Sequence, residues 1–112
     1  MIELVTSTAR VRAPEPARRA RALTAYFSRP VEAEWDPDHR RGHVVFRRGA
    51  GGEAEGTCDL LCGEGVLMLS LEAPAQEIEA LEELVESGLS ASAPQETEEP
   101  AQLEWVRNRR AV

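Results

Sequence analysis

The sequence contains no lysine, few cysteines and no long apolar run. All thirteen basic residues are arginine, which we attribute to a genome that favours Arg, Ala, Gly, Pro and Glu codons. No stretch approaches the roughly 18 uninterrupted apolar residues that a membrane span needs. Residues Met1 to Val5 carry neither the basic flank nor the apolar helix of a signal peptide. We therefore expect a cytoplasmic protein that does not bind a membrane.

Cysteine is scarce, and its spacing argues against a disulfide. Cys58 and Cys62 are the two cysteines, and both fall on one alternating run. At about 3.3 Å per residue in a strand, positions four apart lie about 13 Å from each other on one face. A disulfide needs Cα atoms within about 7 Å. We expect two buried, reduced thiols.

Metal ligands and catalytic motifs are also few. The chain has two histidines, His39 and His43, and no CxxC or HExxH motif, so we expect no metal and no cofactor. A nucleophilic enzyme would need a thiol or hydroxyl beside a histidine base. Cys58 facing His43 across neighbouring strands is the best such pair, and neither residue has a recognisable flanking motif. A small enzyme with His43/Cys58 chemistry is the least supported function.

The charge is unevenly distributed. Residues 1–52 carry ten arginines and six acidic residues, a net charge of +4, whereas residues 53–112 carry three arginines and fourteen acidic residues, a net charge of −11. The total of −7 argues against nucleic-acid binding, which depends on neutralising phosphates. The segregation is typical of two solvated faces of one domain, and it also fits an electrostatic face that binds a partner.

The length of 112 residues is enough for one core and too little for two, so residues 1–112 are predicted to form a single domain. The hydrophobic content of 42% is typical of a globular domain, but aromatic residues make up only 4%. Much of the bulky packing therefore has to come from Tyr26, Phe27, Trp35, Phe46 and Trp105.

Apolar and polar residues alternate in five runs, at 5–12, 31–36, 43–47, 57–62 and 66–72, and each run predicts a strand. In the first run Val5, Ser7, Ala9 and Val11 share one face. Helical spacing of apolar residues predicts a helix over 17–27, after Pro16, and a second over 74–89. A final strand is predicted around Leu103 and Trp105.

The second helix is predicted to bury Ile78, Leu81, Leu84 and Val85, with Glu77, Glu79, Glu82, Glu83 and Glu86 on its outer face. Gly88 is predicted to end it as a C-cap. The remaining segments are predicted to be a flexible Gly-rich loop at 48–56, a polar loop at 90–100 and a basic tail at 107–112.

The order of elements is strand, helix, four strands, helix, strand. This order predicts an α+β fold, in which two helices pack on one face of an antiparallel sheet and bury both helical stripes. The other face of the sheet is then left to solvent or to a ligand.

Several short motifs carry a family resemblance. They are Arg10-Val11 in the first strand, Arg18 and Phe27 in the first helix, the run 31–36, the strand start Gly56-Thr57-Cys58, and a last strand centred on Trp105. With these motifs the sequence resembles the bacterial domain of unknown function 2218 family (DUF2218) over roughly residues 7–107. Related domains occur alongside siderophore-interacting, flavin-binding ferric reductases, which implies a link to iron uptake.

The chain departs from the family pattern at three places. The family usually has Tyr after the Arg of the first helix and His before its Phe, where this chain has Arg19 and Tyr26. The family also has a His-Leu-x-Arg-Phe stretch at the end of the second helix, where this chain has residues 88–92. A role that depends on the two family histidines is therefore not expected here.

We interpret the chain as a small non-catalytic binding or accessory module, linked through the resemblance to iron or siderophore metabolism. The predicted ligand-binding residues are Arg18, Tyr26, Trp35, His43 and Cys58. Arginine can bind carboxylate or catecholate oxygens and aromatic rings can stack, so the predicted ligand is small and anionic or aromatic. A protein partner such as a flavin-dependent ferric-siderophore reductase is a further prediction. The alternative is a protein-interaction module that uses its acidic helix.

Overall fold

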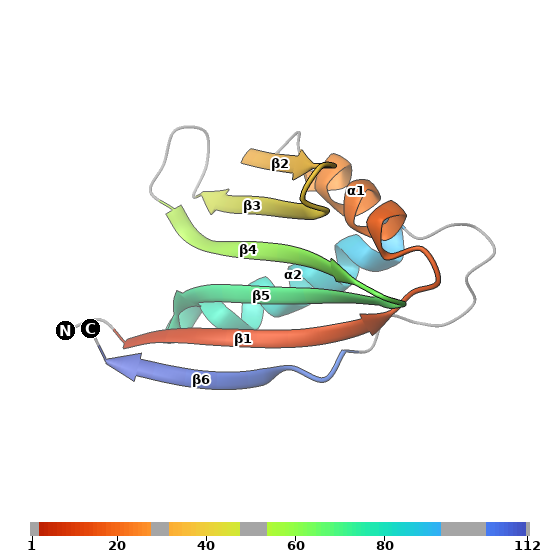
Figure 1. Ribbon diagram of the computed structural model, residues 1–112. Helices are drawn as coiled ribbons and strands as arrows, with labels where there is room; N and C mark the ends of the chain where they lie inside the picture. Colours follow the sequence, from red (N-terminus) through yellow and green to blue (C-terminus); the bar gives the residue numbers. More distant parts are fainter. Residues whose placement is uncertain (1–2, 28–31, 48–53, 93–102, 112) are drawn as a thin grey trace.

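The alternating runs form a six-stranded antiparallel sheet in the computed structural model, which describes residues 3–27, 32–47, 54–92 and 103–111. The elements along the chain are β1 (Glu3–Arg12), α1 (Pro16–Phe27), β2 (Glu32–Asp36), β3 (Arg41–Arg47), β4 (Ala54–Gly63), β5 (Val66–Pro74), α2 (Ala75–Ser92) and β6 (Val106–Ala111). The strands lie in the order β2-β3-β4-β5-β1-β6 (Figure 1). The predicted α+β class and order of elements are confirmed.

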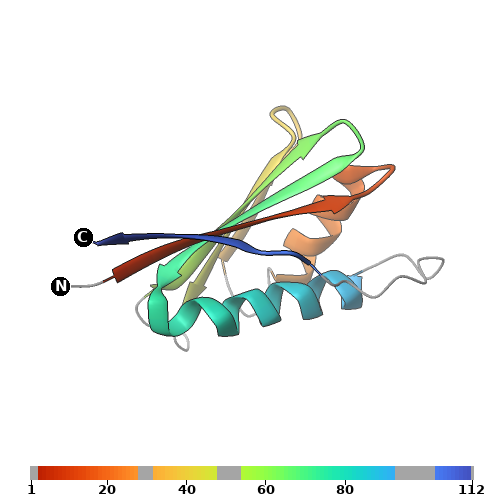
Figure 2. The ribbon, with the colours of Figure 1, turned by 90° about the horizontal axis from the view of Figure 1, so that it is seen from below.

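Both helices cover the same face of the sheet. In Figure 1 they lie behind the strands, and Figure 2 shows them on one side of the twisted sheet. α1 packs against β2, β3, β4 and β5, whereas α2 packs against β1, β4 and β5 and against α1. No described element covers the opposite face, which we call the open face.

The core lies between the sheet and the helices because every second strand residue points inward. Val5, Ser7 and Ala9 of β1 are buried, as the alternation predicts. Phe27 of α1 meets Phe46 of β3 edge to face, with ring centroids 5.4 Å apart. The other large buried side chains are Leu23, Val44, Leu60, Leu67, Leu69, Leu71, Ile78, Leu81, Val85 and Leu89.

The second helix begins and ends later than predicted. Pro74 ends β5, and α2 continues to Ser92, so residues 90–92 of the predicted polar loop are helical and residues 93–100 lie outside the described residues. Gly88 is not a C-cap, because it lies inside the helix against α1. A Cβ atom at Gly88 would lie 2.7 Å from Cζ of Phe27. Glycine therefore allows the close approach of the two helices.

Two residues of α2 lie on faces that the spacing did not predict. Leu84 is 43% exposed, although it was predicted to be buried. Glu82 is 6% exposed, although it was predicted on the outer face. The position of Glu82 follows from its long-range partners, described below, which no helical periodicity can reveal.

The C-terminal strand begins after the position predicted for it. Residues 103–105 are irregular, and β6 pairs antiparallel with β1, so that Arg107 lies opposite Ser7. The predicted basic tail is therefore wrong for residues 107–111, which form an edge strand. Because Arg107 takes an inward position, β6 lacks the apolar alternation that identifies a half-buried strand.

The Gly-rich segment is also partly strand. β4 begins at Ala54, so residues 54–56 of the predicted loop belong to the sheet, and residues 48–53 lie outside the described residues. β3 begins at Arg41, two residues before its predicted start. Val31, the predicted first residue of β2, is also outside the described part.

Candidate functional site

An open hollow of about 770 Å³ lies at the β2–β3 hairpin. We call it the hairpin hollow, and its lining residues are Glu34, Trp35, Asp36, Pro37, Arg41, Gly42, His43 and Asp59. Its volume is within the range of small-molecule sites, about 300 to 1,000 Å³. Polar and charged side chains outnumber the apolar ones, so a ligand would be held mainly by hydrogen bonds and charge.

Sheet register brings the central polar residues of the hollow together. In the antiparallel pairs, His43 of β3 lies opposite Glu34 of β2 on one side and opposite Asp59 of β4 on the other. Directly opposite side chains in such pairs are about 5 Å apart at Cβ. The three residues therefore form a continuous row on the open face.

The turn of the hairpin is stabilised by Asp36. Its carboxylate accepts hydrogen bonds from the backbone N–H groups of Asp38, at 3.1 Å, and His39, at 3.3 Å. The His39 ring lies 2.7 Å from the same carboxylate. Chiefly through the hydrogen bond with His39, the pKa of Asp36 lies below its ordinary value. Asp36 is therefore charged at neutral pH, on the wall of the hollow.

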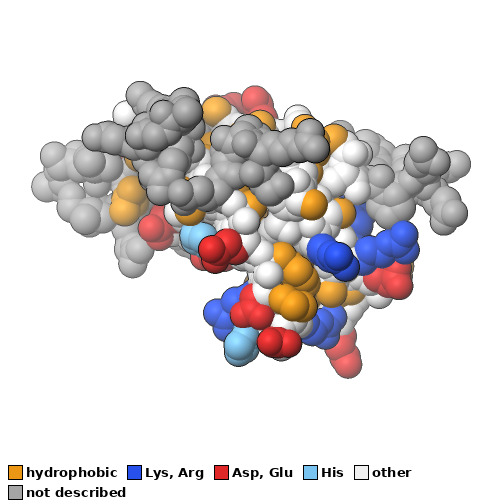
Figure 3. All heavy atoms as spheres, turned by 90° about the horizontal axis from the view of Figure 1, so that it is seen from above, with side chains coloured by type: hydrophobic (Ala, Val, Ile, Leu, Met, Phe, Trp, Pro, Cys, Tyr) orange, Lys and Arg blue, Asp and Glu red, His pale blue; other side chains and the backbone are white. Residues whose placement is uncertain are grey.

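His43 is oriented by a short hydrogen bond. Its Nδ1 lies 2.5 Å from Oδ1 of Asp59. An ionised carboxylate is an acceptor only, so Nδ1 carries the hydrogen and donates, and Nε2 of the neutral ring is an acceptor. Figure 3 shows acidic side chains beside the histidine side chains on this face.

The hollow has a negative balance of charge. Glu34, Asp36 and Asp59 contribute three carboxylates, and Arg41 contributes one guanidinium. Such a site attracts a cation and repels an anion.

The structure does not support the alternative in which His43 faces Cys58. Cys58 lies opposite Val44 on the inner face, whereas His43 is on the open face. Burial raises the pKa of the Cys58 thiol to about 12, and the nearby charge of Asp59 acts in the same direction. A thiol in this state is neither exposed nor ionised, so it cannot act as a nucleophile.

Among the described residues, no serine lies opposite His43 in the sheet. Ser70 of β5 lies next to Asp59 in the register, on the far side from His43. Two strand spacings separate β3 from β5, about 10 Å in all. The His43–Asp59 pair therefore resembles part of a catalytic dyad without a neighbouring serine to activate.

The structure brings two of the five predicted ligand-binding residues to the hollow, Trp35 and His43. Arg18 lies on the surface of α1 and pairs with Glu15 at 3.2 Å. Tyr26 is 46% exposed on α1, with its ring against Phe27. Neither Arg18 nor Tyr26 lines the hollow.

Asp59 is the main residue of the hollow that sequence reasoning missed. It occupies an outward position on the alternating run 57–62, as His43 does on its own run. Only the register of β3 against β4 shows that the two are opposite each other. The length of the Gly-rich connection does not fix that register.

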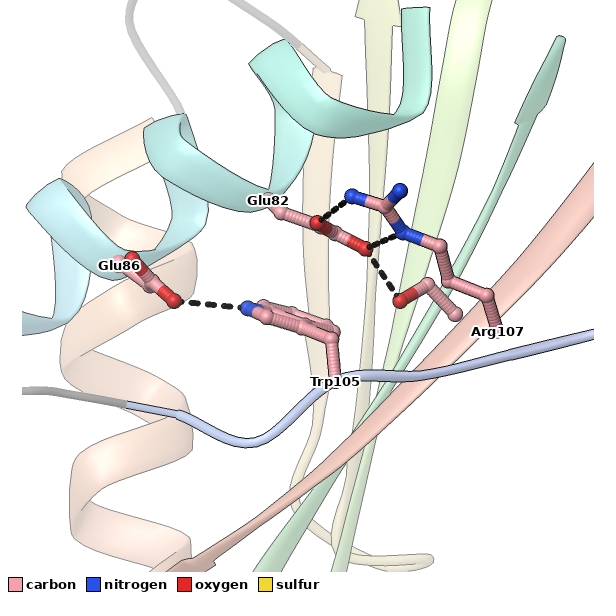
Figure 4. A network of polar contacts seen from close by, with 5 residues as sticks. Glu82, Glu86, Trp105 and Arg107 are labelled. Atoms are coloured by element: carbon pink, nitrogen blue, oxygen red, sulfur yellow. Dashed lines mark hydrogen bonds and ion pairs between the residues drawn. The ribbon is translucent and has the colours of Figure 1, made fainter. Parts of the chain in front are cut away.

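A second polar cluster lies at the other end of the sheet, where α2 meets β1 and β6 (Figure 4). Ser7 Oγ donates to Oε2 of Glu82 at 2.6 Å, and Arg107 donates from Nε and Nη2 to the two oxygens of Glu82, at 2.8 and 2.5 Å. Nearby, Trp105 Nε1 donates to Glu86 at 2.8 Å. These bonds attach the C-terminal strand to α2 and satisfy a buried carboxylate.

The Glu82 carboxylate is more acidic than an ordinary glutamate. Burial alone would raise its pKa, but the hydrogen bonds from Arg107 and Ser7 and the charge of Arg107 outweigh it, so the pKa lies below 4.5. A carboxylate with a lowered folded-state pKa stabilises the protein above its unfolded pKa, and this contribution is lost as the pH falls through the folded-state value.

We therefore expect the free energy of unfolding to change less as the pH falls below 4.5 in Glu82→Gln than in the unmodified protein. Denaturant titrations at steps between pH 6 and pH 3 measure this slope. Glu83→Gln, an exposed neighbour on α2, is the matched control and should leave the slope unchanged. Parallel pH profiles for Glu82→Gln and the unmodified protein would contradict the assignment.

Two observations concern metal binding and membrane-spanning helices. Among the described residues, no group of three or more His, Cys, Asp or Glu side chains is arranged to hold a metal ion. Within the same residues, neither helix is long and apolar enough to cross a membrane.

Comparisons with known proteins identify relatives in bacteria. A family model described as "Uncharacterized protein conserved in bacteria (DUF2218)" matches residues 8–106. The fold is similar to the NMR structure of PA4090 from Pseudomonas aeruginosa, with a TM-score of 0.64 and 23% sequence identity over 95% of this chain and 96% of that one. No curated protein matches the sequence.

Proposed function

The chain belongs to the bacterial DUF2218 family, and we propose that it is a small, non-catalytic binding module that holds its ligand in the hairpin hollow. The observation that carries the proposal is the row of Glu34, His43 and Asp59 inside a hollow of ligand size. The row presents fixed acceptors, and His43 has no serine or cysteine nucleophile beside it on the neighbouring strands.

The charge of the hollow selects the class of ligand. The lining contains three carboxylates and the Nε2 acceptor of His43, but only one guanidinium, from Arg41. A small organic cation, such as an amine or guanidinium, can donate to these acceptors with charge-assisted hydrogen bonds. The Trp35 ring packs on the core side of the sheet, so it adds no aromatic surface to this row. The proposed ligand is therefore cationic rather than anionic.

The proposal keeps the cytoplasmic location expected from the sequence and two elements that the resemblance implies. These two are a link to iron or siderophore metabolism and a protein partner such as a flavin-dependent ferric-siderophore reductase. Their support is the resemblance alone. The hollow adds one condition, which is that an iron complex or partner should present a cationic or hydrogen-bond-donating group to it.

The acidic helix supports a second candidate function. Leu84 is 43% exposed on α2 beside the exposed Glu83, and an exposed leucine next to carboxylates is a plausible contact for a basic partner. In this alternative the chain is a protein-interaction module, and the hollow is not its site.

Calorimetry and thermal-shift measurements with small probes test the first proposal. We expect agmatine and spermidine to bind and raise the melting temperature, and flavin mononucleotide, an anion, to bind more weakly. A ligand at 100 times its Kd adds about 2.7 kcal/mol of stability. His43→Gln should weaken binding of the cationic probes by about tenfold, as expected for the loss of one charge-assisted hydrogen bond.

A control variant accompanies this test. Arg18→Ala removes an exposed arginine from α1, outside the hollow. It should change the affinity by less than about twofold. The proposal is wrong if no cationic probe binds, or if His43→Gln binds them as the unmodified protein does.

A further inference from the structure

A second surface on the open face combines exposed apolar side chains with arginines. Across the sheet, Arg41 of β3, Leu61 of β4, Met68 of β5 and Arg10 of β1 form one continuous row of paired positions. The next row toward the β4–β5 turn contains Val66 and Arg12. We call this surface the Leu61 patch, and its residues are Arg10, Arg12, Arg41, Leu61, Val66 and Met68.

The apolar centre of the patch is accessible. Leu61 is 48% exposed, and Met68 and Val66 are partly exposed. No described element packs on this face, since both helices lie on the other side of the sheet. Leu61, Met68 and Val66 together form the apolar centre that a partner would cover.

The arginines of the patch are available for a partner. Arg10, Arg12 and Arg41 are exposed, and none of them makes an ion pair or a side-chain hydrogen bond with any described residue. By contrast, Arg18 is paired with Glu15 and Arg107 with Glu82. These three guanidinium groups, which have no partner among the described residues, form a local positive surface on a chain whose net charge is −7.

The dimensions of the patch indicate the shape of the partner. Arg41 and Arg10 lie on strands three spacings apart, about 14 Å across the sheet. Leu61 and Met68 lie between them. An α-helix with its side chains is about 10 to 12 Å wide, so a helix lying along the centre has both flanks within reach of an arginine.

We propose that the Leu61 patch binds an acidic amphipathic helix of a partner protein. The apolar stripe of the helix packs on Leu61 and Met68. Carboxylates on one flank pair with Arg10 and Arg12, and carboxylates on the other flank pair with Arg41. The surface is thus distinct in chemistry from the acidic hairpin hollow, although Arg41 borders both.

Other anionic partners fit the patch less well. Nucleic acid and anionic lipid are attracted mainly by extended positive charge, whereas this patch has three arginines around an apolar centre. The phosphates of a nucleic acid would also leave the central leucine and methionine without an apolar contact. An acidic amphipathic helix can pack on the apolar centre and also form ion pairs with the arginines at its borders.

The test uses a labelled synthetic helix of about 20 residues, with leucines along one face and glutamates on both flanks. Its binding is followed by fluorescence anisotropy at two salt concentrations, and its site is mapped by amide chemical shifts. We expect saturable binding that weakens with salt and perturbs β1, β4 and β5. A matched peptide with lysine in place of glutamate should bind at least tenfold more weakly.

Variants of the patch separate this surface from the hollow. Arg10→Glu combined with Arg12→Glu should weaken peptide binding by at least tenfold, and Leu61→Ser by about fivefold. Binding of agmatine in the hollow should be unchanged in both, because none of these residues lines it. Arg18→Glu, on the exposed surface of α1, is the control and should not change peptide binding. Circular dichroism checks that each variant is folded.

Several results would overturn the proposal. They are the absence of saturable binding, equal binding of the lysine peptide, and shift changes confined to the helices. Binding of an RNA oligomer or of phosphatidylglycerol vesicles through Arg10 and Arg12, with no binding of the acidic peptide, would assign the patch to a different partner. Concentration-dependent self-association that Leu61→Ser abolishes would assign it to a second copy of the chain.

Discussion

Replacing Arg107 by alanine is expected to lower the free energy of unfolding by about 2 to 3 kcal/mol, because the substitution leaves the buried Glu82 carboxylate without its cation. Removing one partner of a buried ion pair commonly costs about 3 to 5 kcal/mol. Arg107 is itself 38% exposed, and Ser7 still donates to Glu82, so we expect a smaller cost here. Denaturant titration at neutral pH measures the change.

The matched control for this prediction is Arg18→Ala. Arg18 also makes an ion pair with a glutamate, but both of its partners are largely exposed. Such surface pairs contribute between about 0 and 1 kcal/mol. Glu82→Leu combined with Arg107→Ala removes both charges and should recover part of the stability lost in Arg107→Ala. Equal effects of Arg107→Ala and Arg18→Ala would show that the cluster does not hold β6 to α2.

Replacing Gly56 by valine is expected to destabilise the protein by about 3 kcal/mol or more, because there is no space for a side chain at this position. A Cβ atom would lie 2.6 Å from Cδ1 of Leu81, 2.8 Å from Cβ of Ala73 and 2.8 Å from the backbone oxygen of Glu72. Overpacking a core by one or more methyl groups costs about 1 to 3 kcal/mol, and here part of the obstacle is backbone. Gly56→Ala should have a smaller effect of the same sign.

The contrast for Gly56 is Gly63, on the same strand. A Cβ atom there would meet one side-chain atom, Cγ1 of Val66, at 3.0 Å, and nothing else closer than 3.9 Å. Gly63→Ala should therefore change the free energy of unfolding by less than about 1 kcal/mol. Chemical denaturation of the glycine variants measures the difference. A Gly56→Val protein as stable as the unmodified chain would contradict the tight packing of α2 on β4 and β5.

Much of the fold could be predicted because its signal is local. The alternation of Val5, Ser7 and Ala9 identified β1, and the helical spacing of Ala20, Leu23 and Phe27 identified α1. The errors occurred where contacts between residues far apart in the sequence determine the structure. Gly88 looked like a helix end in the sequence, but it is a close contact with Phe27.

The same distinction applies to the sites. Trp35 and His43 could be chosen as ligand-binding residues from their strands alone, but Asp59 reaches His43 only through the register of β3 against β4. Arg18 and Tyr26 were chosen for their chemistry, but both lie on α1, outside the hollow. Glu82 belongs to an acidic helix and Arg107 to a basic segment, but neither composition shows which glutamate pairs with which arginine.

The position of β2 and β6 at opposite edges of the sheet affects how copies of the chain meet in concentrated solution. Free strand edges are templates for aggregation. The β2 sequence, EAEWD, is acidic, and the β6 sequence, VRNRRA, is basic. Two copies that approach by the same edge bring like charges opposite each other, which destabilises strand pairing. The composition of the edges thus disfavours symmetric pairing of two copies through the same edge.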